Sequence, residues 1–156
     1  MIQDARLLLS GSISAVDNSI TGQTVTGTGT TVVSTNTIDL TQSRDIGEGE
    51  DLYARFQVAT AASGGTSVEF QVITSASASL TSPTILGTTG AIPVASVTAG
   101  KRFAVELSPQ IASLGLRYLG VQYVLVGAVA AGAYVADIGK EIQDGQKFYT
   151  SGFSVL

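Results

Sequence analysis

Hydrophobic and polar side chains alternate in short stretches along the chain, and segments rich in glycine, serine and threonine separate these stretches. The clearest alternation covers residues 52–58, whose even-numbered positions are all apolar: Leu52, Ala54, Phe56 and Val58. Residues 67–73 and 102–107 repeat the pattern, which is typical of β-strands with one buried face. Weaker strand candidates are 5–9, 24–34, 83–87, 117–126 and 132–138. No window has the apolar spacing of an amphipathic helix.

About eight short strands separated by glycine-rich turns predict an all-β protein. We expect an antiparallel β-sandwich of the jelly-roll type, formed by one domain over residues 1–156. Residues 10–35 are almost wholly serine, threonine, glycine and valine. They predict one strand or hairpin with a flexible loop, or else an extended loop that becomes ordered on a partner.

The C-terminal segment 138–156 is polar with isolated aromatic residues, Phe148, Tyr149 and Phe153. It is either a frayed tail or a docking arm, and we favour the arm. The aromatic residues are therefore candidates for a contact with a partner.

The longest apolar run covers residues 118–136, where Gln122 is the only strongly polar side chain. A run of this length could be a membrane-spanning helix. Its composition argues against that, because it is rich in valine, tyrosine and glycine and has no cluster of basic residues beside it. Gly127 and Gly132 also mark a natural turn within it. We therefore expect strands. One face of the strand 117–126 would carry Leu119, Val121, Tyr123 and Leu125, and the other Gln122, Val124 and Val126.

A sandwich strand normally buries one face in the core and leaves the other in water. A strand that is apolar on both faces therefore needs a second layer that covers its outward face. That cover would be a loop or tail of the same chain, or another protein. We expect the segment to lie at a subunit contact, formed by Leu119, Val121, Tyr123, Val124, Leu125 and Val126.

Charge and composition narrow the functions further. The net charge is −4 with only 8 Lys and Arg, so the sequence predicts no contact with nucleic acid and none with an anionic membrane. The chain has no His and no Cys, which removes the commonest general base, the thiolate nucleophile and most transition-metal ligands. No catalytic motif is present, so we expect neither an enzyme nor a cofactor.

An acidic cluster, RDIGEGED, precedes the strand at 52. Such a cluster could form a calcium loop, but its spacing does not fit an EF-hand, and a solvated turn is the simpler interpretation. We expect Asp39, Arg44 and Asp45 to organise this loop.

Four motifs in order and register resemble the Bbp16-like family of phage capsid cement proteins: NTIDL (36–40), RDIGEGEDLY (44–53), AGKRF (99–103) and LRYLGVQY (116–123). They are followed by VAD (135–137) and a Gln at 143 or 146. The resemblance implies a jelly-roll protein made in the host cytoplasm and carried on the outer surface of an icosahedral virion head. It also implies that the protein bridges neighbouring major capsid proteins of the HK97-like fold. A homodimer at or near two-fold positions is implied, with a trimer as the alternative. The family supplies no catalytic residue.

Two other functions remain as alternatives. A carbohydrate- or receptor-binding module of a tail fibre would need an exposed aromatic platform, which the absence of Trp disfavours. An accessory glycosidase or lyase would need two carboxylates facing each other across a cleft.

Overall fold

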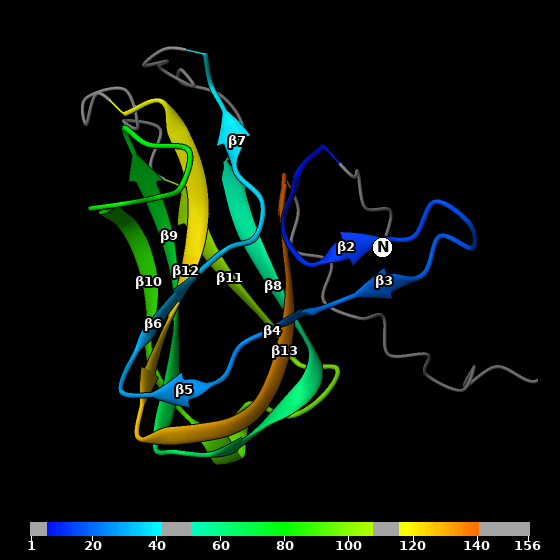
Figure 1. Ribbon diagram of the computed structural model, residues 1–156, viewed down its shortest axis with the longest axis vertical. Coiled ribbons are helices and arrows are strands. Elements are labelled where there is room, and N and C mark those ends of the chain that lie inside the picture. Colours follow the sequence, from blue (N-terminus) through cyan, green and yellow to red (C-terminus); the bar gives the residue numbers. More distant parts are fainter. Residues whose placement is uncertain (1–5, 42–50, 108–115, 141–156) are drawn as a thin grey trace, which may run out of the picture.

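A computed structural model describes residues 6–41, 51–107 and 116–140. These residues form two antiparallel β-sheets packed face to face, which confirms the predicted all-β sandwich (Figure 1). The first sheet has the order β1 (Leu8–Ser10), β13 (Ala128–Gly139), β8 (Leu52–Gly64), β11 (Arg102–Leu107), with β4 (Gln23–Thr24) and β5 (Gly27–Thr28) also paired to β13. The second has the order β10 (Thr84–Pro93), β9 (Ser67–Ser75), β12 (Tyr118–Val126), β6 (Thr31–Val33), with β7 (Ile38–Asp39) also paired to β12. A separate hairpin pairs β2 (Ser12–Ile13) with β3 (Ile20–Thr21), and one short 3-10 helix, η1, covers Val94–Ser96.

The described residues contain thirteen strands, more than the eight that we expected. Eight of them make up the two four-stranded paths, and the other five are short strands of two residues each. Sharing eight main strands between two sheets is compatible with the jelly-roll type. Among the short strands, β5 lies within the predicted strand 24–34, and β2 and β3 form a hairpin in the segment 10–35, where one strand or hairpin was expected. Their individual bounds could not be predicted, because two residues are too few to show an alternation.

The core lies between the two sheets and follows the predicted alternation. The inward positions of β8, β9 and β12 are almost completely buried. Their aromatic members pack as one cluster with β13: the ring centroid of Phe70 lies 5.3 Å from that of Phe56, 5.7 Å from that of Tyr123 and 5.1 Å from that of Tyr134. These edge-to-face and tilted contacts join the two sheets near the middle of the sandwich.

The turn between β12 and β13 differs from the prediction. It lies at Gly127 alone, whose φ of 78° favours glycine, and β13 starts directly afterwards at Ala128. Gly132 is therefore a strand residue, and it is small because a Cβ there would lie 2.6 Å from the Tyr134 hydroxyl oxygen. The turn takes the chain from the second sheet to the first, and the β8–β9 turn beside it makes the opposite crossing, from the first sheet to the second.

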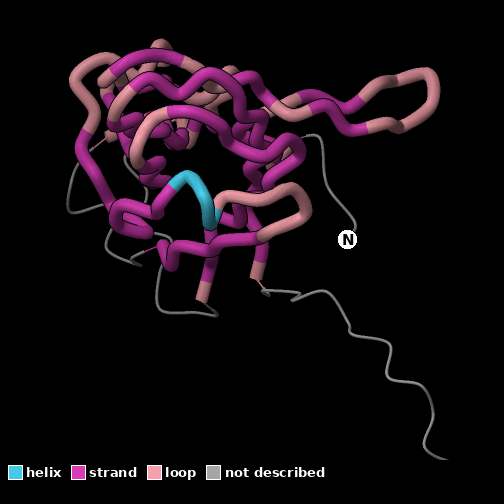
Figure 2. Tube along the Cα trace, turned by 90° about the horizontal axis from the view of Figure 1, so that it is seen from below, coloured by secondary structure: helices cyan, strands magenta, loops and turns pink. Residues whose placement is uncertain are grey.

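The segment 10–35 has more structure than a flexible loop. It begins with the β2–β3 hairpin, which extends away from the sandwich in two perpendicular views (Figures 1 and 2). It then runs back along the sandwich, where β4 and β5 pair with the first sheet and β6 pairs with the second. The segment thus connects the two sheets along one side.

The apolar run 118–136 forms strands in both halves, as expected. No helix among the described residues is long and apolar enough to cross a membrane. Strand β13 continues to Gly139, so residues 138 and 139 belong to the sandwich rather than to a docking arm. Phe148, Tyr149 and Phe153 lie outside the described residues.

Candidate contact surfaces

The outward side of the second sheet combines a polar strip with exposed apolar residues, and we call it the contact face. In an antiparallel sheet, residues directly opposite each other share a face. Because Val121, Tyr123 and Leu125 point into the core, the alternate residues of β12 and their partners point outward. The contact face comprises Thr31, Val33, Glu69, Gln71, Ile85, Thr88, Gln122, Val124 and Val126.

The polar strip crosses three strands and is held by its own hydrogen bonds. Gln122 Nε2 donates to Gln71 Oε1 at 2.5 Å, and Gln71 Nε2 donates to Glu69 Oε1 at 2.7 Å. Thr88 Oγ1 donates to the same carboxylate oxygen at 2.5 Å. The bonds from Thr88 and Gln71 lower the pKa of Glu69, against the opposing effect of burial. Glu69 therefore stays charged at neutral pH and fixes the two amide side chains.

Apolar side chains are exposed on the same face. Val126 at the end of β12 has 48% of its surface exposed and Ile85 on β10 has 51%, while Val33 on β6 is also exposed. Val124 is half-buried between Thr31 and Glu69. A sheet face that keeps several aliphatic side chains in water around a fixed polar strip is suited to contact with another protein.

Part of the expected second cover comes from the chain itself. Leu80, in the loop between β9 and β10, is almost completely buried and lies over Gly120 of β12, where any Cβ would collide with its Cδ1. Ser75 Oγ holds this loop by donating to the Thr81 carbonyl at 2.8 Å. The cover ends before Val126, so only the far half of the strand is open to a partner.

The structure divides the predicted contact residues of β12 into two groups. Val124 and Val126 lie on the contact face, as described above. The other four point into the core and are at most 2% exposed, so they hold the sandwich together and are not available to a partner: Leu119, Val121, Tyr123 and Leu125. The alternation already separated the two faces of the strand, but both are largely apolar, so the sequence analysis assigned both to the contact; the structure shows which face is buried in the core.

Among the residues expected to organise the acidic loop, Asp39 is described, and Arg44 and Asp45 lie outside the described residues. Asp39 binds Arg117 through two hydrogen bonds of 2.6 Å each. The bond from Arg117 is the main reason that the pKa of Asp39 falls to about 2. Arg117 also lies over the ring of Tyr118, 5.0 Å from its centroid. Asp39 thus ties β7 to the start of β12.

A second ion pair was missed by the sequence analysis. Arg55 Nε donates to Asp137 Oδ1 at 2.9 Å, and Arg55 Nη2 donates to Asp137 Oδ2 at 2.6 Å. The side chain of Asp137 is 2% exposed and that of Arg55 17%. The two residues are directly opposite in the β8–β13 ladder. Each is a charged outward position in its own strand, but their pairing could not be known without the register.

The β2–β3 hairpin is another surface, and we call its residues 12–21 the arm. It lies in the segment 10–35, for which we expected one strand or hairpin with a flexible loop, or else an extended loop that becomes ordered on a partner. Ile13 and Ile20 face each other across its two strands. Its tip carries Val16, which is 96% exposed. The segment shows only a short alternation, SISA, which is a weak strand signal among so many polar residues.

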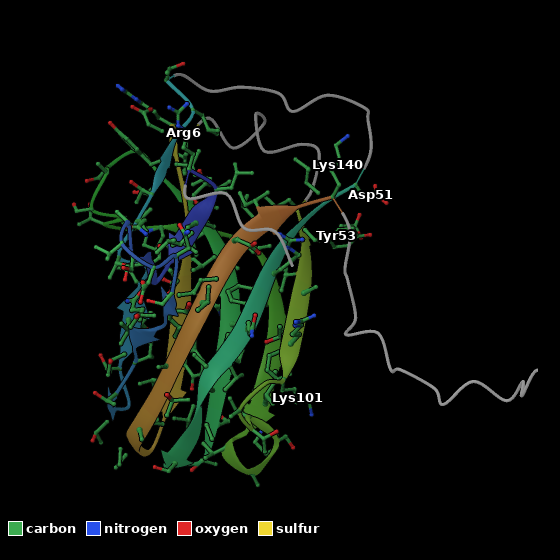
Figure 3. All side chains as sticks on the ribbon, turned by 90° about the vertical axis from the view of Figure 1, so that its right-hand side faces the viewer. Arg6, Asp51, Tyr53, Lys101 and Lys140 are labelled. Atoms are coloured by element: carbon green, nitrogen blue, oxygen red, sulfur yellow. The ribbon has the colours of Figure 1, made fainter. Side chains whose placement is uncertain are left out.

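In the three described ranges no three His, Cys, Asp or Glu side chains group closely enough to hold a metal ion. Of the acidic cluster at 45–51, only Asp51 is described, and it is exposed. The basic residues Arg6, Lys101 and Lys140 lie well apart on the sandwich (Figure 3).

Comparison with known protein families matches residues 20–138 to the sequence model of the Bbp16 family. The matched region is more than half of the chain and runs from the start of β3 to the penultimate residue of β13. No curated protein matches the chain.

Proposed function

Because this chain belongs to the phage-associated Bbp16 family, we propose that it is a cement protein of the phage head. In this proposal it binds the outer surface of the icosahedral shell and bridges neighbouring major capsid proteins of the HK97-like fold. The single observation that carries the proposal is the family match, which extends through both sheets of the sandwich.

The physical properties of the chain support an external, adhesive role. Its net charge of −4 disfavours a position beside the packaged DNA inside the head. The contact face supplies aliphatic side chains around a polar strip whose side chains are joined to one another by hydrogen bonds, which is the mixture of groups found in protein interfaces. A protein that binds only the assembled shell also stabilises it by mass action.

We further propose that the protein acts as a homodimer, with a trimer as the alternative, and that it makes and breaks no covalent bond. A two-fold pair of sandwiches would present two contact faces to two capsid subunits, which is the geometry that a bridge needs.

The direct test is binding to heads that lack this protein, measured by cosedimentation. We expect the wild type to bind and to raise the temperature at which the heads break open. The double variant Val124→Lys with Val126→Lys places two charges on the contact face and should reduce binding at least tenfold. Thr98→Lys, an exposed change in the loop between η1 and β11, is the matched control and should bind like the wild type.

Light scattering and circular dichroism show whether the double variant is still folded and whether it still self-associates. A folded double variant that binds heads as well as Thr98→Lys would rule out the contact face. A wild-type protein that ignores heads but binds immobilised glycans would instead support the tail-fibre module.

A further inference from the structure

The hydrogen bonds of the polar strip all run toward one carboxylate oxygen on the contact face. Gln122 donates to Gln71, which donates in turn to Glu69 Oε1. Thr88 donates to the same oxygen, and its own hydroxyl accepts from the Gly90 backbone nitrogen at 3.0 Å. The other carboxylate oxygen, Glu69 Oε2, accepts no hydrogen bond from any residue that the structure describes. Glu69 is therefore satisfied on one side only.

The free oxygen of Glu69 is in contact with solvent. Among the described side chains, the only polar atoms that are buried without a hydrogen-bond partner are the hydroxyls of Tyr123 and Tyr134. Because Glu69 Oε2 has no partner either and does not belong to that buried pair, water reaches it. While the face is uncovered, this oxygen takes its hydrogen bonds from water.

The surroundings of Glu69 leave its charge unbalanced. Val124 lies directly opposite Glu69 on β12, and Ala91 is its partner on β10. The exposed Val126 follows two residues further along β12. No Lys or Arg belongs to the contact face, so the face presents a single negative charge beside aliphatic side chains.

This charge restricts which surface can cover the face. A partner would displace the water on Glu69 Oε2, and an ionised carboxylate that is buried without a donor is strongly unfavourable. Glu69 does not escape by taking up a proton at neutral pH, because the hydrogen bonds from Thr88 and Gln71 lower its pKa. A partner must therefore supply a hydrogen-bond donor, and a donor with a positive charge also balances the carboxylate.

The aliphatic neighbours favour arginine over lysine as that donor. A guanidinium is more weakly hydrated than an ammonium, so it loses less when it moves from water into a contact. Arginine is enriched in protein interfaces, whereas lysine is depleted there. The methylene stem of an arginine could also pack along Val124 and Val126 while its charged end reaches Glu69.

We propose that the contact face binds an arginine side chain of the shell subunit beneath it, and that the guanidinium donates to Glu69 Oε2. This inference rests on the proposed function, because it names the partner group for a face already assigned to the shell. In this arrangement the arginine sets the position of the shell subunit on the sheet, and the valines supply contact area around it.

The first test is the variant Glu69→Gln in the cosedimentation assay with heads that lack this protein. Its amide oxygen can still accept from Gln71 and Thr88, so the strip is kept, but the charge is lost and an NH2 group replaces Oε2. We expect binding to weaken at least tenfold. Glu106→Gln removes an exposed carboxylate from β11 in the other sheet and should bind like the wild type. Circular dichroism and urea unfolding show whether both variants are folded.

The second test uses the wild-type protein and does not depend on the folding of a variant. Heads that lack this protein are treated with butanedione in borate buffer, which blocks arginine side chains reversibly. Treated heads should bind the wild type at least tenfold more weakly, and removal of the borate should restore binding. Acetylation of the lysines of the heads should change binding far less. Electron micrographs show whether the treated heads are intact.

The inference and the proposed function fail in different ways. A folded Glu69→Gln variant that binds heads as well as the wild type would overturn the inference and leave the proposed function standing. Loss of binding after acetylation, with butanedione having no effect, would also overturn it, because the partner group would then be a lysine. If the wild type does not bind untreated heads, the proposed function fails, and the inference fails with it.

Discussion

At the scale of single residues, two ion pairs in this protein share a geometry but differ in burial. Both are double hydrogen bonds between a guanidinium and a carboxylate, with a shortest distance of 2.6 Å. Arg55 and Asp137 are largely buried, whereas the side chains of Arg117 and Asp39 are 48% and 41% exposed. Water screens the attraction between the charges of the exposed pair. If one partner of the buried pair is removed, the remaining charge has little water around it to stabilise it.

We predict that Asp137→Ala lowers the free energy of unfolding by about 2–4 kcal/mol, because Arg55 loses the carboxylate that balances its buried charge. Urea unfolding at neutral pH measures the change. Asp39→Ala is the matched control and should have a clearly smaller effect. Equal losses in the two variants would show that burial does not separate the pairs.

At the scale of elements, the sandwich depends on turns that pass between its sheets. Gly127 has a φ of 78° and joins β12 to β13. A Cβ at this position would lie 3.0 Å from the Gly65 Cα and 3.0 Å from the Thr66 backbone nitrogen. The two turns that change sheet are thus packed backbone to backbone, and neither can move without the other.

We predict that Gly127→Ala destabilises the protein more than Gly100→Ala. Gly100 also has a positive φ, 82°, but a Cβ there would meet nothing within 4 Å. Gly100→Ala should therefore cost only the backbone strain of about 1–2 kcal/mol, and Gly127→Ala should cost that strain plus the displacement of the β8–β9 turn. Thermal and urea unfolding of the two variants give the comparison. A smaller loss for Gly127→Ala would mean that the turns are not tightly packed.

At the scale of the whole molecule, the composition predicts how stability depends on pH. Without His or Cys, no side chain has an ordinary pKa between about 5 and 8. The pKa values of Asp17 and Asp39 are about 2 in the folded protein, because hydrogen bonds stabilise their charged forms, from Ser14 and Ser19 and from Arg117 respectively. Burial raises the pKa of Tyr134 to about 12.

We therefore expect the free energy of unfolding to be flat from pH 6 to pH 8. The lowered pKa values of Asp17 and Asp39 stabilise the folded protein at any pH above about 4, the pKa of Asp in the unfolded chain. This stability is lost as the pH falls toward 2. The raised pKa of Tyr134 contributes stability that is lost as the pH rises above about 10. Urea unfolding across this range at constant ionic strength checks the profile. A marked slope between pH 6 and pH 8 would contradict it.

The sequence by itself determined the class of the fold and the inward positions of the main strands. Alternation of apolar and polar residues in 52–58 and 102–107 identifies buried faces because the side chains of a strand point alternately to its two sides. The absence of His and Cys, the low charge and the resemblance to the Bbp16 family are also properties of the sequence alone, and the family match confirms that resemblance.

Only the tertiary structure decided which apolar residues can meet a partner. Tyr123 and Val124 are adjacent in a largely apolar run, yet one is in the core and the other on the contact face, because strand pairing sets the direction of each side chain. The pairing of Arg55 with Asp137 and the projection of the arm likewise depend on contacts between residues distant in the chain. Local patterns carry no information on such contacts, since a strand looks the same in sequence whichever neighbour it finds.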